Sequence, residues 1–291
     1  MKKISVILLC VFLISSCASF PGSALLATPT ETATLVPPTE TPIPFAISVN
    51  GLTITKGEYS GEIERFQASQ TKLGGSKTSE EVAKLVQEEL VSQLLLAQGA
   101  SEAGFVLTDA DLQKKIDALT AELGSKEKVE EWITNNFYTD ETFREALRRN
   151  TAVAWMRNSI ASQTPITAEQ VHIRQLLLYD EPTAQYYLSQ LQAGIDFDVL
   201  ATQIEPVTRG DIGWFPKGYI PDPVVEEAAF GLEVGQTSPI ITGNSGFYIL
   251  KCLDKQPTRV LSPDALSVMQ KLAIADWINT QRSAANIQIN P

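Results

Sequence analysis

Histidine and cysteine are both scarce in this 291-residue chain. It contains one histidine, His172, and three cysteines, at positions 10, 17 and 252. Structural zinc sites take four Cys, His or carboxylate ligands, and catalytic sites usually take three, with His and Cys dominant. So few histidines and cysteines exclude the usual kind of zinc site, and we expect neither a metal nor a cofactor.

Basic residues are also in the minority. The chain has 23 Lys and Arg against 34 Asp and Glu, a formal net charge of −11. Nucleic acids and anionic lipid surfaces attract basic proteins. We therefore expect no nucleic-acid partner, and no membrane attraction beyond an anchor of the protein's own.

The N-terminus has the order of parts of a secretory signal. Two lysines precede an apolar run, residues 4–14, that is too short to span a bilayer. The segment Ile14-Ser15-Ser16-Cys17 resembles the lipobox of bacterial lipoproteins, which implies a lipid on Cys17 and cleavage before it. We expect residues 1–17 to be a lipoprotein signal and the protein to be extracytoplasmic, lipid-anchored to the bacterial cell membrane. An ordinary signal peptide with a chance cysteine is the alternative.

Two consequences follow from this N-terminus. Cys252 becomes the one thiol of the mature chain, so no intramolecular disulfide is available, and its apolar surroundings predict a buried small hydrophobe. Residues 18–45 are rich in Thr and Pro without apolar periodicity, which predicts a disordered tether. A Thr-rich cell-wall or glycosylated spacer is the alternative to a simple tether.

Residues 46–166 combine a hairpin signal with several helix-start signals. The pair Asn50-Gly51 between two short apolar stretches predicts a β-hairpin over residues 46–54. Apolar residues then recur at helical spacing after capping residues. The predicted helix starts are Thr78, Thr108, Glu127 and Thr139. The side chains expected to face the core are Val82, Leu85, Val86, Leu90, Leu94, Ala97, Leu112, Ile116, Leu119, Leu123, Val129, Trp132, Ile133, Phe143, Leu147, Val153 and Trp155.

The order of these parts resembles the N-terminal chaperone region of SurA/PrsA-type foldases. Three stretches carry the resemblance: ISVNG at 47–51, AGFVLTD at 103–109 and TDETFREALR at 139–148. It implies a helical chaperone domain over residues 46–166. Its acidic residues are expected on solvated helix faces, with no catalytic role.

From Glu169 onward the pattern changes to mixed strands and helices. Five motifs follow in order: DFDVLA from 196, GDIGWF from 210, EEAAFGL from 226, VGQTSP from 234 and SGFYILK from 245. Together they resemble the parvulin (PpiC-type rotamase) peptidyl-prolyl isomerase domain. The resemblance implies a four-stranded antiparallel sheet wrapped by helices over residues 167–258, and an α+β chain as a whole.

The resemblance also implies a site for an X–Pro bond. The substrate-binding positions are Ile212, Ile220, Val225 and Phe230, and the catalytic positions are Gln175, Tyr248 and Ser245. Rotation of the bond is opposed by amide resonance, about 18–20 kcal/mol, and needs no nucleophile. A dry pocket that holds the proline ring and disfavours the planar amide is sufficient to lower this barrier.

The sequence departs from the parvulin pattern at its two histidine positions. Gln175 and Tyr248 replace them, and we hypothesise a hydrogen bond between these side chains across the pocket floor. His172 lies three residues before Gln175, so strand alternation places it on the opposite side of the sheet. We interpret it as a surface or core residue.

The C-terminus predicts a return to the helical domain. Ser262-Pro263 is a helix start, and the helix is expected to present Leu266, Met269, Ala273 and Trp277 on one face. Residues 287–289 are a short strand that we expect beside residues 47–49. Residues 262–291 would then complete the helical domain.

Two functions remain open at this point. The first is a foldase whose partners are unfolded or newly secreted polypeptides with X–Pro segments, since slow prolyl isomerisation can limit folding. The second is a non-catalytic holdase chaperone or peptide-binding module that retains a degenerate parvulin domain. The replacements at Gln175 and Tyr248 favour the second; the retained apolar positions favour proline binding.

Overall fold

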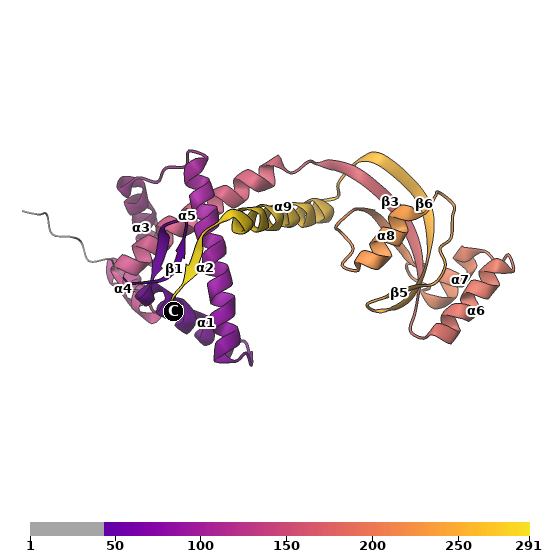
Figure 1. Cartoon of the computed structure of the whole chain (residues 1–291), viewed down its shortest axis with the longest axis horizontal. Helices are drawn as coiled ribbons and strands as arrows, with labels where there is room; N and C mark the ends of the chain where they lie inside the picture. Colours follow the sequence, from indigo (N-terminus) through magenta and orange to yellow (C-terminus); the bar gives the residue numbers. More distant parts are fainter. Residues whose placement is uncertain (1–43) are drawn as a thin grey trace, which may run out of the picture. The chain divides into compact units, whose positions relative to one another are not determined.

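The computed structural model describes residues 44–291, so the predicted signal, the lipidation position Cys17 and most of the predicted tether lie outside the described residues. The described chain is α+β, with two antiparallel sheets (Figure 1). We call residues 45–164 together with 263–289 the helical lobe, and residues 167–260 the sheet domain. The first strand begins at Phe45, one residue before the predicted domain boundary.

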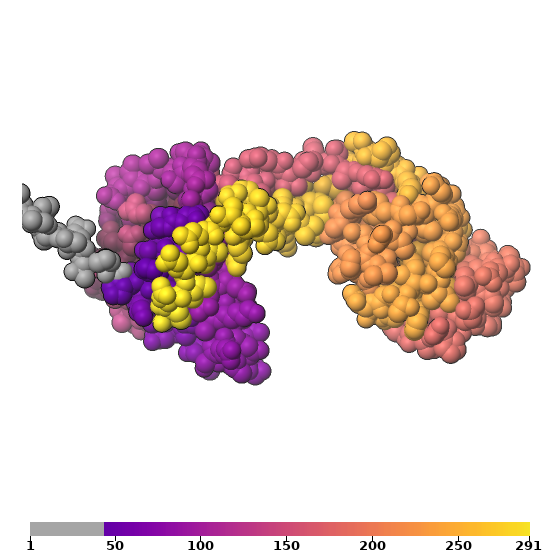
Figure 2. Space-filling model, in the orientation of Figure 1, coloured from indigo at the N-terminus to yellow at the C-terminus, as the bar shows by residue number. Residues whose placement is uncertain are grey.

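The helical lobe contains a three-stranded sheet of order β2-β1-β7, formed by β1 (Phe45–Val49), β2 (Leu52–Thr55) and β7 (Ile287–Ile289). The hairpin turn has positive φ at Asn50 (53°) and Gly51 (91°), the geometry that matches strand twist. The C-terminal strand pairs with β1, Ile47 opposite Ile289. Figure 2 shows these yellow C-terminal residues against the indigo start of the lobe. Both the hairpin and this pairing are confirmed.

Five helices follow the hairpin: α1 (Lys56–Lys72), α2 (Ser79–Glu102), α3 (Asp109–Leu123), α4 (Lys126–Asn135) and α5 (Asp140–Gln163). Thr78, Thr108 and Thr139 are N-caps of α2, α3 and α5, as predicted. Each side chain accepts a hydrogen bond from the backbone N–H three residues later, which satisfies a donor that the helix itself leaves unpaired.

Helix α1 was not predicted from the sequence. Its buried residues are Glu58, Tyr59 and Gly61, so it has no long apolar stripe for a periodicity argument to detect. Its start signal was nevertheless present, because Thr55 and Glu58 form a capping box.

The prediction of a core position is wrong for three side chains. Leu85, Trp132 and Trp155 are 37%, 39% and 36% exposed. The two tryptophans cover the edges of small clusters, with ring centroids 5.4 Å apart for Trp155 and Phe105 and 6.2 Å for Trp132 and Tyr138. Large side chains at such edges keep one side in water.

Helix α9 (Pro263–Ala284) returns to the helical lobe, where it contacts α2 and α5. Ser262 caps it and Pro263 occupies its first position, as predicted. The indole of Trp277 lies directly on Gly99 of α2, where an added Cβ would be 2.5 Å from the ring. The C-terminal segment therefore completes the packing of the helical lobe.

The sheet domain has the predicted four-stranded antiparallel sheet. It is formed by β3 (Thr167–Leu178), β4 (Asp211–Pro216), β5 (Ile241–Gly243) and β6 (Gly246–Val260), in the order β4-β3-β6-β5. Helices α6 (Glu181–Gln192) and α7 (Phe197–Ile204) pack on one face, and α8 (Pro223–Gly231) packs on the other. Strand β6 extends two residues beyond the predicted domain end.

Candidate functional site

The face of the sheet under α8 carries the apolar residues that were predicted to bind proline. Along β3, Val171, Ile173 and Leu177 pack on this face, whereas Leu176 and Leu178 pack against α6 and α7. We call the group under α8 the pocket cluster. Its members are Val171, Ile173, Leu177, Ile212, Phe215, Tyr219, Ile220, Val225, Ala228, Ala229, Phe230, Leu232, Ile241, Tyr248, Leu250 and Cys252.

The four predicted substrate-binding residues all belong to the pocket cluster. Val225 is 3% exposed, whereas Ile212, Ile220 and Phe230 keep part of their surface accessible. The Phe230 ring stands edge-on to the buried Phe215, with centroids 6.0 Å apart. The structure thus gathers residues from β4, the β4–α8 loop and α8 into one apolar wall.

The predicted catalytic positions differ in their relation to this wall. Tyr248 lies in the pocket cluster and is 8% exposed, and Ser245 is exposed in the β5–β6 turn. Gln175 shares the face of Val171 and Ile173 by strand alternation.

The hypothesised hydrogen bond between Gln175 and Tyr248 is absent from residues 44–291. The register of β3 and β6 does not oppose the two residues, because Gln175 is opposite Leu250 and Tyr248 is opposite Leu177. The two side chains are therefore diagonal neighbours, which lie farther apart than a directly opposed pair.

A tight loop holds the start of β4 against β3. The N–H of Gln175 donates to the carbonyl oxygen of Gly210 at 2.8 Å. Arg209 and Gly210 both have positive φ, 55° and 68°, and a Cβ at position 210 would overlap the carbonyl oxygen of Gln175. Only glycine meets both conditions at position 210.

His172 lies on the opposite face of β3 from the pocket cluster. Its Nε2–H donates to Asp211 Oδ1 at 2.8 Å, and its ring lies 5.3 Å from that of Trp214. Burial opposes ionisation of Asp211, but hydrogen bonds from His172 and the Gly213 N–H outweigh it and lower the pKa of this carboxyl. No motif in the sequence indicated this pair or its neighbour Arg174, which pairs with Asp198.

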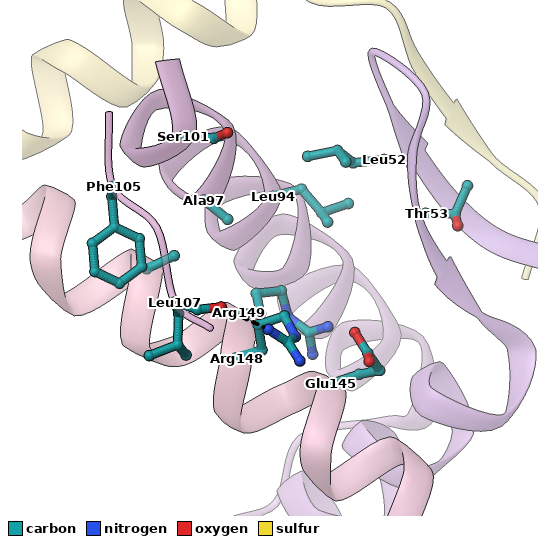
Figure 3. Close-up of a pocket in the computed structure, with 11 residues that line it drawn as sticks. Leu52, Thr53, Leu94, Ala97, Ser101, Phe105, Leu107, Glu145, Arg148 and Arg149 are labelled. Atoms are coloured by element: carbon teal, nitrogen blue, oxygen red, sulfur yellow. Dashed lines mark hydrogen bonds between the residues drawn. The ribbon is translucent and has the colours of Figure 1, made fainter. Parts of the chain in front are cut away.

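A second candidate site is a cavity of about 310 Å³ in the helical lobe (Figure 3). It is bounded by β2, α2, the α2–α3 connection and α5. Figure 3 shows Leu94, Ala97 and Ser101 along α2, with Phe105 and Leu107 to their left. The remaining lining residues are Leu52, Thr53, Glu145, Arg148, Arg149 and Ala152. No local pattern in the sequence indicated this cavity, because its walls come from separate segments.

The two arginines at the cavity are already engaged by protein groups. Arg149 Nη1 lies 3.0 Å from Glu58 Oε1, and both side chains are 9% exposed. Arg148 donates to the carbonyl oxygen of Leu107 at 3.0 Å and to Asp109 at 2.7 Å. What the cavity offers a ligand is therefore chiefly its apolar wall.

Among residues 44–291, no group of three or more His, Cys, Asp or Glu side chains is placed to hold a metal ion. The same part of the chain includes no helix with the length and apolarity needed to cross a membrane. Cys252 is fully buried, and burial raises the pKa of its thiol, as expected of a small core residue.

The architecture agrees with the class of protein that the sequence resemblance implies. The described chain has a helical lobe with an apolar cavity and a four-stranded antiparallel sheet with an apolar wall under one helix, the two parts expected of a parvulin-type foldase.

Comparison with known proteins places the chain in a family. Residues 2–157 match the SurA-like N-terminal domain model, and residues 181–254 match the PPIC-type PPIASE domain model. The chain belongs to the SurA-like N-terminal domain family and is a SurA/PrsA-type parvulin foldase.

Several proteins similar to this chain are named PrsA. The foldase protein PrsA of Caldanaerobacter subterraneus is 29% identical over 230 residues, 70% of this chain and 71% of that one. PrsA of Oceanobacillus iheyensis is 25% identical over 73% of this chain and 74% of that one. A crystal structure of the peptidylprolyl isomerase PrsA of Bacillus cereus aligns with a TM-score of 0.46 and 18% identity, over 82% of this chain and 91% of that one.

Proposed function

We propose that this protein is a membrane-anchored, extracytoplasmic foldase for newly secreted polypeptides. The helical lobe, predicted as residues 46–166 plus 262–291, would bind apolar segments, and the domain predicted as residues 167–258 would act on X–Pro bonds. The observation that carries the proposal is the pocket cluster, which gathers Ile212, Ile220 and Phe230 with accessible surface on one wall.

The chemistry proposed for this wall is modest. It receives the proline ring in an apolar environment, and Gln175, Tyr248 and Ser245 supply hydrogen-bonding groups around it. An amide, a phenol and a hydroxyl can each donate to the twisted X–Pro bond, whose nitrogen becomes a better acceptor when resonance is lost. No covalent intermediate is required.

The anchor is proposed from the sequence of residues 1–17. A diacylglyceryl group on Cys17, with a further acyl chain, would give stable membrane attachment where one chain would not. Mass spectrometry of the N-terminal peptide would detect these lipids, and an unmodified Cys17 would refute the anchor.

Replacing Ile220 with Glu is expected to reduce catalysed X–Pro exchange at least tenfold, because a carboxylate would have to be desolvated beside the proline ring. The measurement is cis–trans exchange in a series of short X–Pro peptides, followed by NMR. Val234→Glu is the matched control, since Val234 is 58% exposed and lies outside the pocket cluster. Equal exchange rates in the two variants would refute the proposed pocket.

Replacing Leu52 with Asp is expected to raise severalfold the protein concentration needed to suppress aggregation of a denatured client. Leu52 lines the helical-lobe cavity and is 44% exposed, so the change adds charge to the wall with little cost to folding. Leu73→Asp is the control, because Leu73 is 84% exposed and does not line the cavity. If L52D and the wild type suppress aggregation at the same protein concentration, the cavity is not where clients bind.

A non-catalytic holdase is the second candidate. It is favoured by Gln175 and Tyr248 at the family's histidine positions and by the burial of Tyr248. This alternative predicts aggregation suppression without enhanced exchange in any X–Pro peptide, so the same two assays separate the candidates.

A further inference from the structure

Asp222, the N-cap of α8, does more than cap its helix. One carboxylate oxygen, Oδ1, accepts from the N–H of Val224 at 3.2 Å and of Val225 at 3.5 Å. The other, Oδ2, accepts a short hydrogen bond from the N–H of Asn244, in the β5–β6 turn. Asp222, only 8% exposed as a residue, thus ties the start of α8 to the turn that precedes Tyr248.

The approach of this turn to Asp222 leaves no room for a side chain. A Cβ added to Gly243 would be 2.5 Å from Asp222 Oδ2, 2.7 Å from the Tyr248 ring and 3.0 Å from Val225. The hydrogen bond to Asn244 therefore holds the turn against the same ring and helix that form the pocket wall.

Glu226, one helical turn after Asp222, makes a corresponding link to the β4–α8 loop. Its Oε2 accepts from the N–H of Gly218 at 2.9 Å, and its Oε1 accepts from the N–H of Ile220 at 3.0 Å. Both oxygens are used, and both hold the loop that carries Ile220.

We propose that Asp222 and Glu226 are positioning residues for the prolyl site. They link α8, which carries Val225 and Phe230, to the loop with Ile220 and the turn before Tyr248. The inference rests on the proposed isomerase function and deepens it. Charged acceptors suit this role because each carboxylate serves two or more N–H donors, and bonds to an ionised acceptor are stronger than bonds to a neutral one. A site displaced by about 1 Å can lose about 10²-fold in rate.

Two variants separate positioning from helix capping. Asp222→Ser keeps a good N-cap but lacks the second oxygen that reaches Asn244. Glu226→Gln keeps the side-chain length but offers one acceptor oxygen, so one of its two loop bonds is lost. Glu227→Gln is the control, since Glu227 is exposed and accepts no hydrogen bond from either segment in the described chain.

The test measures X–Pro exchange by NMR in the full protein, with kcat and KM separated, and records the amide proton shifts of Gly218, Ile220 and Asn244. We expect kcat/KM to fall about tenfold in D222S and E226Q and to change less than twofold in E227Q. D222S should move the Asn244 amide upfield, and E226Q the Gly218 or Ile220 amide.

Two results would overturn the inference. In the first, the wild type is active and D222S and E226Q exchange X–Pro peptides at the same rate as the wild type. The proposed function would then stand, and both carboxylates would be structural contacts only. If the wild type catalyses no exchange, the isomerase function fails, and titration with X–Pro peptides decides the inference: weaker binding by D222S and E226Q than by E227Q supports it. Equal peptide binding by D222S, E226Q and E227Q, or no peptide binding by the wild type, overturns the inference.

Discussion

Replacing Glu58 with Ala is expected to lower the free energy of unfolding by about 3–5 kcal/mol, the usual cost of leaving one partner of a buried ion pair unpaired. Glu58 Oε1 lies 3.0 Å from Arg149 Nη1, and each side chain is 9% exposed. Glu58 also completes the capping box of α1, accepting from the Thr55 N–H at 2.9 Å. The measurement is urea unfolding of the wild type and the variant.

A double-mutant cycle tests the cause. Arg149→Ala should be comparably destabilising, and the double variant should lose less than the sum of the two, because no unpaired charge is left behind. Glu130→Ala is the control: its partner Lys126 is 3.4 Å away, but the side chains are 62% and 80% exposed, so the pair contributes little. A loss in E58A no larger than in E130A would contradict the account.

Replacing Gly210 with Ala is expected to cost about 2–5 kcal/mol, combining roughly 1–2 kcal/mol for a left-handed residue with roughly 1–3 kcal/mol for overpacking. The new Cβ would overlap the carbonyl oxygen of Gln175, and relief requires β4 to move away from β3. X–Pro exchange should fall in parallel, because Ile212 follows this loop and lies in the pocket cluster.

Gly235→Ala separates the two contributions. Gly235 has φ of 85°, and its added Cβ would meet nothing within 4 Å, so this variant carries the backbone strain alone. Urea unfolding of both variants should show a clearly larger loss for G210A. Equal losses would mean that the close approach to Gln175 has no energetic consequence.

Local signals in the sequence predicted much of the helical lobe. Thr78, Thr108 and Thr139 each placed a helix start correctly, because N-capping depends on residues three positions apart. Helix α1 was missed because its few buried residues form no apolar stripe. The predicted burial of Trp132 and Trp155 failed for another reason. Their exposure depends on where they lie at the edges of side-chain clusters, which helical spacing does not show.

The candidate site was predicted less completely. Motif order located Ile212, Ile220, Val225 and Phe230, which the structure gathers in one cluster. The hydrogen bond expected between Gln175 and Tyr248 was wrong because it depends on strand register, which places Gln175 opposite Leu250 and Tyr248 opposite Leu177. Asp222 and Glu226 were not identified, since their contacts join segments that only the folded chain brings together.

The most direct test of the two-site account is the refolding of a client protein whose slow phase is limited by an X–Pro bond. We expect the wild type to accelerate the slow phase and to suppress aggregation. I220E should lose the acceleration but keep the suppression, and L52D should lose mainly the suppression. An unchanged slow phase in the presence of the wild type, with aggregation still suppressed, would contradict the isomerase and leave a holdase.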